Sequence, residues 1–164
     1  MNPRPESLPC EFRTPTFPKG QYHANIPPDK VTVMSAGPGS NIYIAIVEDD
    51  ESLCRSFNRL LRAAGFQAVT YSSAEAYLAD VKRPRFDCLL LDIELPGISG
   101  LELHRRLISL GSVTPVIYLT AHEDPETQAL ALAAGCAGYF CKTESGYRVM
   151  DAIRHAMTDA QNAF

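Results

Sequence analysis

The sequence lacks three features that would direct it to a membrane, to secretion or to nucleic acid. Its longest apolar runs, such as residues 42–47 and 88–91, are far shorter than the roughly 20 residues that span a bilayer. The proline-broken N-terminus contains no continuous apolar stretch of a signal peptide, which predicts a cytoplasmic protein. Runs of lysine and arginine are absent and the formal net charge is −4, so we expect no direct binding of nucleic acid.

Cysteine follows no metal-binding or redox pattern. The number of cysteines, five, is odd, and none forms a C-x-x-C pair. Because a cytoplasmic compartment keeps thiols reduced, we predict free thiols at positions 10, 54, 88, 136 and 141.

Proline is concentrated at the N-terminus. Eight of the twelve prolines lie within residues 1–40, together with scattered charge and no sustained apolar periodicity. Such a segment cannot bury enough surface to offset the entropy lost on ordering, so we predict a disordered tail over 1–40. Translation starting at Met34 and a tail peptide that docks on a partner are the two alternatives.

From residue 41 the sequence alternates between short apolar runs and amphipathic stretches, which is typical of an α/β domain. Five strands, each followed by a helix, predict a parallel sheet covered on both faces. The fold class is then a flavodoxin-like, doubly wound three-layer sandwich with strand order 2-1-3-4-5. We place this domain at 41–157, followed by a short C-terminal tail at 158–164. The predicted strands are 42–47, 66–71, 86–91, 113–119 and 138–141.

The intervening stretches predict helices with recognisable ends. In the first, Asp50 is the expected N-cap and Gly65 ends the helix. The second is expected to bury Ala76, Tyr77 and Val81. The ranges predicted for the second to fifth helices are about 73–82, 100–110, 125–134 and 145–157.

Polar residues follow the predicted strands at the edge where ligands bind in such sheets. They are Glu48, Asp49 and Asp50 after the first strand, Asp92 after the third, Thr120 after the fourth and Lys142 after the fifth. If the first and third strands are neighbours, Asp49 faces Asp92 and three carboxylates share one crevice.

Such a crevice predicts a bound cation, because carboxylates packed together repel one another and lose solvation. Oxygen ligands without histidine or cysteine favour Mg²⁺ over zinc or copper. A magnesium ion permits a carboxylate to attack a phosphoryl donor, with lysine and threonine contacting the phosphoryl oxygens. The residues therefore predict an aspartyl-phosphate site.

Four separated motifs carry a resemblance to a known family. In order and spacing they resemble the response-regulator receiver domain of two-component signalling, over about residues 41–157. The motifs are I-A-I-V-E-D-D at 44–50, L-L-L-D-I-E-L-P-G-I-S-G at 89–100, P-V-I-Y-L-T-A at 115–121 and A-G-C-A-G-Y-F-C-K at 134–142.

The resemblance implies a role for each residue of the acidic cluster. Asp92 matches the phosphoacceptor. Asp49 matches a direct Mg²⁺ ligand, and Glu48 matches a residue that acts on the ion through water. Asp92 itself and the backbone carbonyl of Glu94 complete the implied protein ligands.

The resemblance also implies a conformational switch and an output surface. Thr120 and Lys142 match the pair that contacts the phosphoryl group, and Tyr139 matches an aromatic residue whose rotamer changes with Thr120. The implied output face is 124–134 together with 138–157. The implied partners are a sensor histidine kinase or phosphotransfer protein, a downstream protein and, through the same face, a second copy of the chain. The implied chemistry is limited to the protein's own phosphorylation and dephosphorylation, so no other enzyme activity is expected.

Two positions depart from the family pattern. Thr143 follows Lys142 where receivers often have a proline with a cis bond. Because a cis bond before a non-proline residue costs about 3 kcal/mol, we expect a trans bond here. The anionic side chain of Glu94 lies at the expected mouth of the site, and we expect it to alter the lifetime of the phosphoryl group.

Several other polar residues have ordinary structural explanations. Asp50 and Glu51 are interpreted as solvated acids in the first turn of a helix. His104 and His155 have no second ligand four residues on, so we predict surface or partly buried histidines and no metal site. His122 lies two residues beyond Thr120, and a place on the rim of the site is a minority interpretation.

The main hypothesis is a stand-alone receiver, since only seven residues follow Met157 and a helix-turn-helix module needs several helices. The alternative is a receiver fragment of a helix-turn-helix transcription regulator, which the sequence texture also resembles. A haloacid-dehalogenase-type phosphatase is less favoured, because its D-x-D motif follows the first strand and Glu94 stands in place of the second Asp. A phosphorylation-independent scaffold is disfavoured because every site position is filled.

Overall fold

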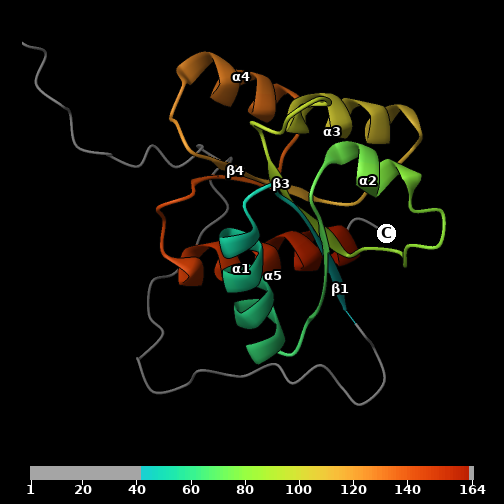
Figure 1. Ribbon diagram of the computed structural model, residues 1–164, viewed down its shortest axis with the longest axis vertical. Coiled ribbons are helices and arrows are strands. Elements are labelled where there is room, and N and C mark those ends of the chain that lie inside the picture. The colour runs from blue at the N-terminus through green and yellow to red at the C-terminus, as the bar shows by residue number, and fades with distance from the viewer. Residues whose placement is uncertain (1–41, 163–164) are drawn as a thin grey trace, which may run out of the picture. The chain divides into compact units, whose positions relative to one another are not determined.

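The computed structural model describes residues 42–162, in which a five-stranded parallel sheet brings distant segments together (Figure 1). The strand order is β2-β1-β3-β4-β5, so the predicted order is confirmed. The predictions made for residues 1–40, including Met34 and Cys10, lie outside the described residues. The strands are β1 (Tyr43–Val47), β2 (Gln67–Tyr71), β3 (Cys88–Asp92), β4 (Val116–Thr120) and β5 (Gly138–Cys141).

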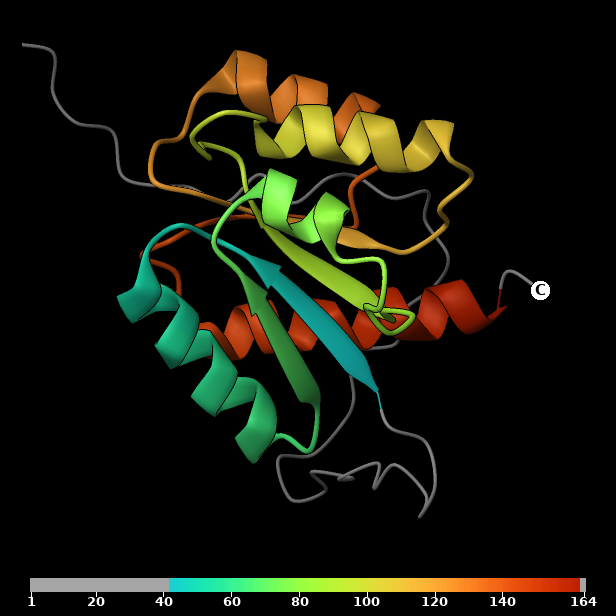
Figure 2. The same cartoon turned by 45° about the vertical axis from the view of Figure 1, so that its right-hand side comes forward.

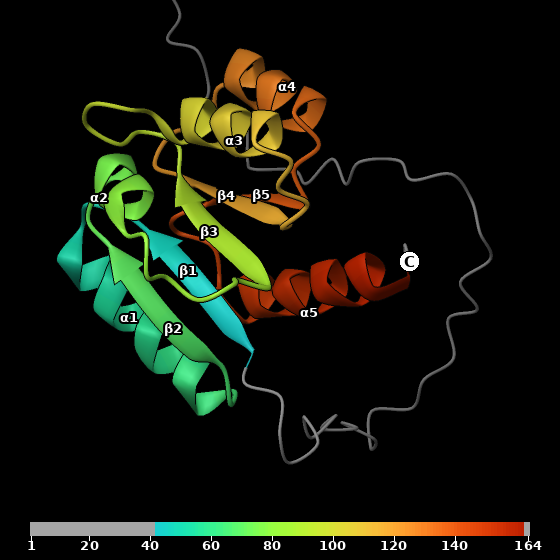
Figure 3. The same ribbon diagram turned by 90° about the vertical axis from the view of Figure 1, so that its right-hand side faces the viewer.

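A helix follows every strand, and the helices divide between the two faces of the sheet. Figures 1 and 3 show α2, α3 and α4 on one face and α1 and α5 on the other. The predicted three-layer sandwich is therefore confirmed. The helices are α1 (Glu51–Ala63), α2 (Ala74–Ala79), α3 (Gly100–Ser109), α4 (Pro125–Ala133) and α5 (Gly146–Asn162).

Two apolar cores hold these layers together, one on each face of the sheet. Alternate residues of a strand point to opposite faces, so β1 contributes to both cores. Ala45 and Val47 pack beneath α2, α3 and α4, whereas Ile44 and Ile46 pack against α1 and α5. Figure 2 shows the strands lying between the two helical layers. Burial on both faces explains why the central strands read as continuous apolar runs.

The first helix begins and ends where the sequence predicted. The Asp50 side chain accepts hydrogen bonds from the backbone amides of Ser52 at 2.7 Å and Leu53 at 3.1 Å, so it caps the helix that follows. Gly65 lies just beyond Ala64, with a φ of 88° that glycine adopts without a steric penalty. These two residues fix the length of α1 and hold its first turn next to the carboxyl end of β1.

The second helix is shorter than predicted, and two of its expected core contacts are wrong. It ends at Ala79 because Asp80 leaves the helical conformation and its carboxylate accepts a hydrogen bond from the hydroxyl of Tyr71 at 2.9 Å. Val81 therefore lies beyond the helix and is 89% exposed, and Ala76 is exposed as well.

Several strand and helix ends differ from prediction, and four of them bear on the site or on the extent of the domain. β4 begins at Val116 because Pro115 has no backbone N–H to give to a ladder. β3 and β4 each continue one residue further than predicted, so Asp92 and Thr120 are the last residues of their strands. α5 continues past Met157 because residues 158–162 contain neither glycine nor proline, and this part of the predicted tail is helical.

The described part of the chain contains four of the cysteines, and all four are free thiols, as predicted. Cys88 is completely buried in β3 and belongs to the core beneath α1 and α5. No helix within 42–162 combines the length and the apolar character needed to cross a bilayer.

Candidate functional site

The acidic residues of the candidate site come from the carboxyl ends of two neighbouring strands. Glu48 and Asp49 directly follow β1, and Asp92 ends β3, which pairs with β1 through Val47 and Leu91. A carboxylate oxygen of each acid lies within 4.8 Å of the others. The strand order thus brings together the three carboxylates that the sequence scatters over 45 residues.

The three carboxylates differ in their access to water. Glu48 and Asp92 are each only 1% exposed, whereas Asp49 is exposed. Glu48 and Asp92 are therefore shielded from water at the edge of the core, whereas Asp49 places one side of the cluster in contact with solvent. Ionised groups in this position need a compensating charge.

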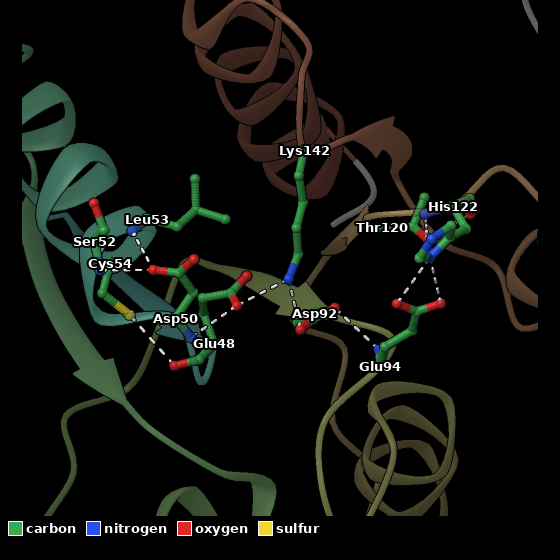
Figure 4. Close-up of polar contacts among 10 residues, drawn as sticks. All are labelled: Glu48, Asp50, Ser52, Leu53, Cys54, Asp92, Glu94, Thr120, His122 and Lys142. Atoms are coloured by element: carbon green, nitrogen blue, oxygen red, sulfur yellow. Dashed lines mark hydrogen bonds and ion pairs between the residues drawn. The ribbon is translucent and has the colours of Figure 1, made fainter.

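Lys142 supplies part of that charge. It follows β5, and its Nζ atom donates hydrogen bonds to Glu48 Oε1 at 2.9 Å and Asp92 Oδ2 at 2.8 Å (Figure 4). Burial alone would lower the pKa of Lys142, but its hydrogen bonds to Asp92 and Glu48 raise the pKa overall. The ammonium group stays charged, and one ammonium against three carboxylates leaves the cluster negative.

Two oxygens beside this cluster lack partners within the described residues. Glu48 Oε2 is buried and accepts no hydrogen bond, and burial raises the pKa of this carboxyl despite the contact with Lys142. The backbone amide of Glu94 donates to Asp92 Oδ1 at 3.0 Å, while no donor of residues 42–162 contacts the Glu94 backbone carbonyl. A buried, unpaired carboxylate oxygen in an all-oxygen group is the donor chemistry that Mg²⁺ prefers.

Thr120 ends β4 beside this cluster, and its hydroxyl is bound to the loop that follows. Thr120 Oγ1 donates to the backbone carbonyl of His122 at 2.7 Å and accepts from the His122 backbone amide at 3.2 Å. The side chain is 1% exposed. In this conformation the hydroxyl hydrogen is used by the β4–α4 loop, not by the acidic cluster.

The rim of the site is closed by a contact that the sequence did not predict. His122 Nδ1 lies 3.3 Å from Glu94 Oε1 and 3.4 Å from Oε2, which joins the β4–α4 loop to the β3–α3 loop (Figure 4). Both side chains are exposed, with 80% of the His122 side chain and 49% of the Glu94 side chain open to solvent. The rim position considered for His122 is therefore the one it occupies, and Glu94 is its partner.

Tyr139 lies in β5, and its register partner in β4 is Tyr118. The ring packs against the core beneath α2, α3 and α4. Its hydroxyl is buried without a hydrogen bond of good geometry among the described residues; burial raises the pKa of this phenol, and the nearby Thr120 side chain opposes that rise.

The peptide bond between Lys142 and Thr143 is trans, as expected for a threonine at this place. Among the histidines with structural explanations, His155 is exposed on α5, and its Nδ1 lies 2.9 Å from the backbone carbonyl of Asp151 and 3.6 Å from Asp151 Oδ2. His104 is buried and its Nδ1 lies 2.8 Å from the hydroxyl of Tyr118, so the surface or partly buried position predicted for it is wrong. Sequence patterns do not reveal this pair, because His104 lies on a helix and Tyr118 lies on a strand 14 residues away.

Comparison with known proteins agrees with this geometry. Residues 44–154 match the family model described as response regulator receiver domain. The response regulator protein TodT of Pseudomonas putida is 34% identical over 114 residues, which cover 70% of this chain and 50% of that protein. The transcriptional regulatory protein FixJ of Bradyrhizobium diazoefficiens is 29% identical over 121 residues, which cover 74% of this chain and 59% of that protein.

Similarity extends to solved structures. A CheY-like response regulator receiver domain protein from Methanospirillum hungatei superposes with a TM-score of 0.71 at 25% identity, covering 76% of this chain and all of that one. The match therefore covers the whole of that receiver domain and 76% of this chain, whereas this chain spans about half the length of TodT.

Proposed function

The chain belongs to the response regulator receiver domain family, and on this basis we propose that it is a phosphoacceptor of two-component signalling. In this proposal Asp92 takes a phosphoryl group from a sensor histidine kinase or a phosphotransfer protein. The observation that carries the proposal is the place of Asp92, buried at the end of β3 between Lys142 and the acids of β1.

The transfer would proceed by attack of an Asp92 carboxylate oxygen on the phosphorus of a phosphohistidine. The new O–P bond forms as the P–N bond breaks, and the electron pair of that bond returns to the donor imidazole. Lys142, which already contacts Asp92, is placed to pair with a phosphoryl oxygen as the carboxylate loses its charge.

The proposed Mg²⁺ ligands are Asp49, Asp92 and the backbone carbonyl of Glu94, with Glu48 acting through water. The unpaired buried oxygen of Glu48 and the open Glu94 carbonyl support this set. When bound, Mg²⁺ would supply positive charge that offsets the carboxylates and the phosphoryl oxygens.

Thr120 and Tyr139 form the proposed switch. To donate to a phosphoryl oxygen, the Thr120 hydroxyl must leave the backbone carbonyl of His122. That movement changes the surroundings of the Tyr139 ring and biases α4, β5 and α5, the proposed output face. Leu130 and Leu132 of α4 are each 47% exposed, so this face offers apolar surface to a downstream protein or a second copy.

We propose no catalysis on a separate substrate, because the chemistry is confined to the chain's own aspartate. The proposed location is the cytoplasm. The domain expected from the sequence is 41–157 with tails at 1–40 and 158–164, and because α5 continues to Asn162 we propose that the domain extends to that residue.

Incubation with Mg²⁺ and a small acyl phosphate, followed by intact-protein mass measurement, tests the proposal. The wild-type chain is expected to gain one phosphoryl group, and Asp92→Asn is expected to gain none. Asp151→Asn, which alters an exposed aspartate of α5, is the matched control and should behave like the wild type. Phosphorylation that persists in Asp92→Asn would contradict the assignment of the acceptor.

A second candidate is that the chain is the receiver part of a helix-turn-helix transcription regulator. Two facts favour it: the chain covers only about half of TodT and three fifths of FixJ, and FixJ is a transcriptional regulatory protein. The full open reading frame distinguishes the two candidates, because only the second requires a DNA-binding module in the same chain.

A further inference from the structure

The loop between β3 and α3, residues 93–99, carries the Glu94 carbonyl, so its conformation decides where that oxygen lies. Its first half is anchored in the core, because Ile93 and Leu95 are each only 6% exposed. Its second half contains Pro96, which has no backbone N–H, and Gly97, which has a φ of 78°. This second half needs support from outside the loop.

Glu75 of α2 provides that support. Its Oε1 accepts a hydrogen bond from the backbone amide of Ile98 at 2.8 Å. Within the described residues, no other backbone amide of residues 95–99 donates a hydrogen bond. A Cβ atom on Gly97 would overlap the Glu75 carboxylate, so the loop and the side chain lie in direct contact.

The contact between Glu75 and Ile98 joins an ionised carboxylate to a backbone amide. The amide of Ile98 lowers the pKa of Glu75, so the side chain is a carboxylate at neutral pH. Glu75 is the second residue of its helix and joins two segments that are 23 residues apart. No residue of the acidic cluster contacts it in this structure.

We propose that Glu75 is a positioning residue of the cation site, which holds the β3–α3 loop through the Ile98 amide and so fixes the Glu94 carbonyl. The inference rests on the proposed function, because it concerns the same Mg²⁺ ligands. It adds a residue from α2, an element that contributes nothing else to the site. Glu75 acts through the loop and does not itself bind the ion.

The expected effect is a loss of Mg²⁺ affinity without a loss of fold. Partners that orient a metal ligand directly are worth about 10- to 100-fold in affinity, and Glu75 acts one step further away, so we expect about a fivefold weakening in Glu75→Ala. Glu75→Gln retains an oxygen that accepts from Ile98 and is expected to stay within about twofold of the wild type.

Calorimetric titration of the full chain with MgCl₂ measures the affinity, and thermal unfolding in EDTA measures the fold without the ion. Glu126→Ala is the matched control, because Glu126 is also the exposed second residue of its helix, α4, and its removal deletes the same charge. The control is expected to bind Mg²⁺ like the wild type. All four proteins are expected to unfold at similar temperatures in EDTA.

A second measurement needs no variant. In wild-type protein with Mg²⁺, hydrogen exchange followed by NMR is expected to show the Ile98 amide protected and the Gly97 amide fast. An unprotected Ile98 amide overturns the inference, even where Glu75→Ala does not fold.

The outcomes separate the inference from the function on which it rests. Weak binding in Glu75→Ala with recovery in Glu75→Gln supports the positioning role. Unchanged affinity in Glu75→Ala overturns it, and equal weakening in both variants overturns it as well, since charge and not the hydrogen bond would then matter. Failure of the wild-type chain to bind Mg²⁺ overturns the proposed function itself.

Discussion

Replacing Lys142 with methionine removes the ammonium group that bridges Glu48 and Asp92 while keeping a side chain of similar length. Both carboxylates are 1% exposed, so water does not replace the lost partner. The variant therefore leaves two neighbouring buried acids with no compensating charge in the absence of a metal ion. The Mg²⁺-free protein is expected to be markedly less stable.

The size of the effect follows from the burial of the two acids. Removing one partner of a buried ion pair costs about 3–5 kcal/mol, and the Lys142 side chain is 20% exposed, so we expect about 3 kcal/mol. In a domain of this size 1 kcal/mol corresponds to roughly 4 °C, which predicts a fall of about 12 °C in the unfolding midpoint in EDTA.

Magnesium is expected to stabilise this variant more than the wild type, because Lys142 and the ion compete for the same carboxylates. If Mg²⁺ binds about ten times more tightly without the lysine, saturating ion adds about 1.4 kcal/mol, or about 5 °C, beyond its effect on the wild type. The stability deficit in EDTA should also shrink as the pH falls. Burial raises the pKa of Glu48, so protonation of this acid relieves the repulsion as the pH falls.

Thermal unfolding in EDTA and in MgCl₂ at two pH values measures all three effects. Lys82→Met, which alters an exposed lysine, is the control and should change none of them. An unchanged midpoint of Lys142→Met in EDTA, or equal stabilisation of both proteins by Mg²⁺, would refute the reasoning from a shared set of buried carboxylates.

Three further predictions concern the loop, the helix start and the buried histidine. Glu94→Asn removes an anion from the rim. Phosphorylation by an acyl phosphate and decay of the aspartyl phosphate are each expected to be about threefold faster, because two unit charges ~7 Å apart in water repel by ~0.6 kcal/mol. Equal rates of the two proteins in a discontinuous phosphate-release assay would dismiss a role for this charge. Gly100→Ala would gain up to ~1 kcal/mol of stability from helix propensity, but its Cβ would overlap the backbone carbonyl of Asp92. A net loss of about 1–3 kcal/mol in the free energy of unfolding is therefore expected in urea, and a stabilised variant would contradict the packing argument. Burial lowers the pKa of His104, so the free energy of unfolding of the wild type should fall as the pH drops below about 6.5. His104→Gln, whose side chain can still bond Tyr118, should lose less stability between pH 7.5 and 5.5. Parallel pH profiles of the two proteins would show that His104 does not cause the pH dependence.

Local sequence rules predicted the helix starts well, because capping depends on residues a few positions apart. Asp50 was identified as an N-cap from its place before an amphipathic stretch, and its carboxylate accepts from the amides of both Ser52 and Leu53 in the first turn. The same rules failed at α2, where Tyr71 draws Asp80 out of the helix. That contact joins a strand to a helix end, and no local periodicity records it.

The acidic cluster was accessible to sequence reasoning for a different reason. Strand order in a doubly wound sheet places the residues after β1 and β3 at one edge, so Asp49 and Asp92 had to meet once the order was right. The contact between Glu94 and His122 was not accessible in the same way. It depends on the course of two loops and on the directions of two exposed side chains.

By itself the sequence determined the alternation of strands and helices, the parallel sheet and the residues at its carboxyl edge, because apolar periodicity and strand-end position are properties of the chain order. Only the tertiary structure decided that Lys142 bridges Glu48 and Asp92, that one oxygen of Glu48 is left buried and unpaired, and that Glu75 holds Ile98. These contacts join side chains to groups 23 to 94 residues away along the chain. Whether a hydrogen bond forms depends on differences of a few tenths of an ångström between donor and acceptor positions. Packing sets these positions, and residue spacing along the chain does not.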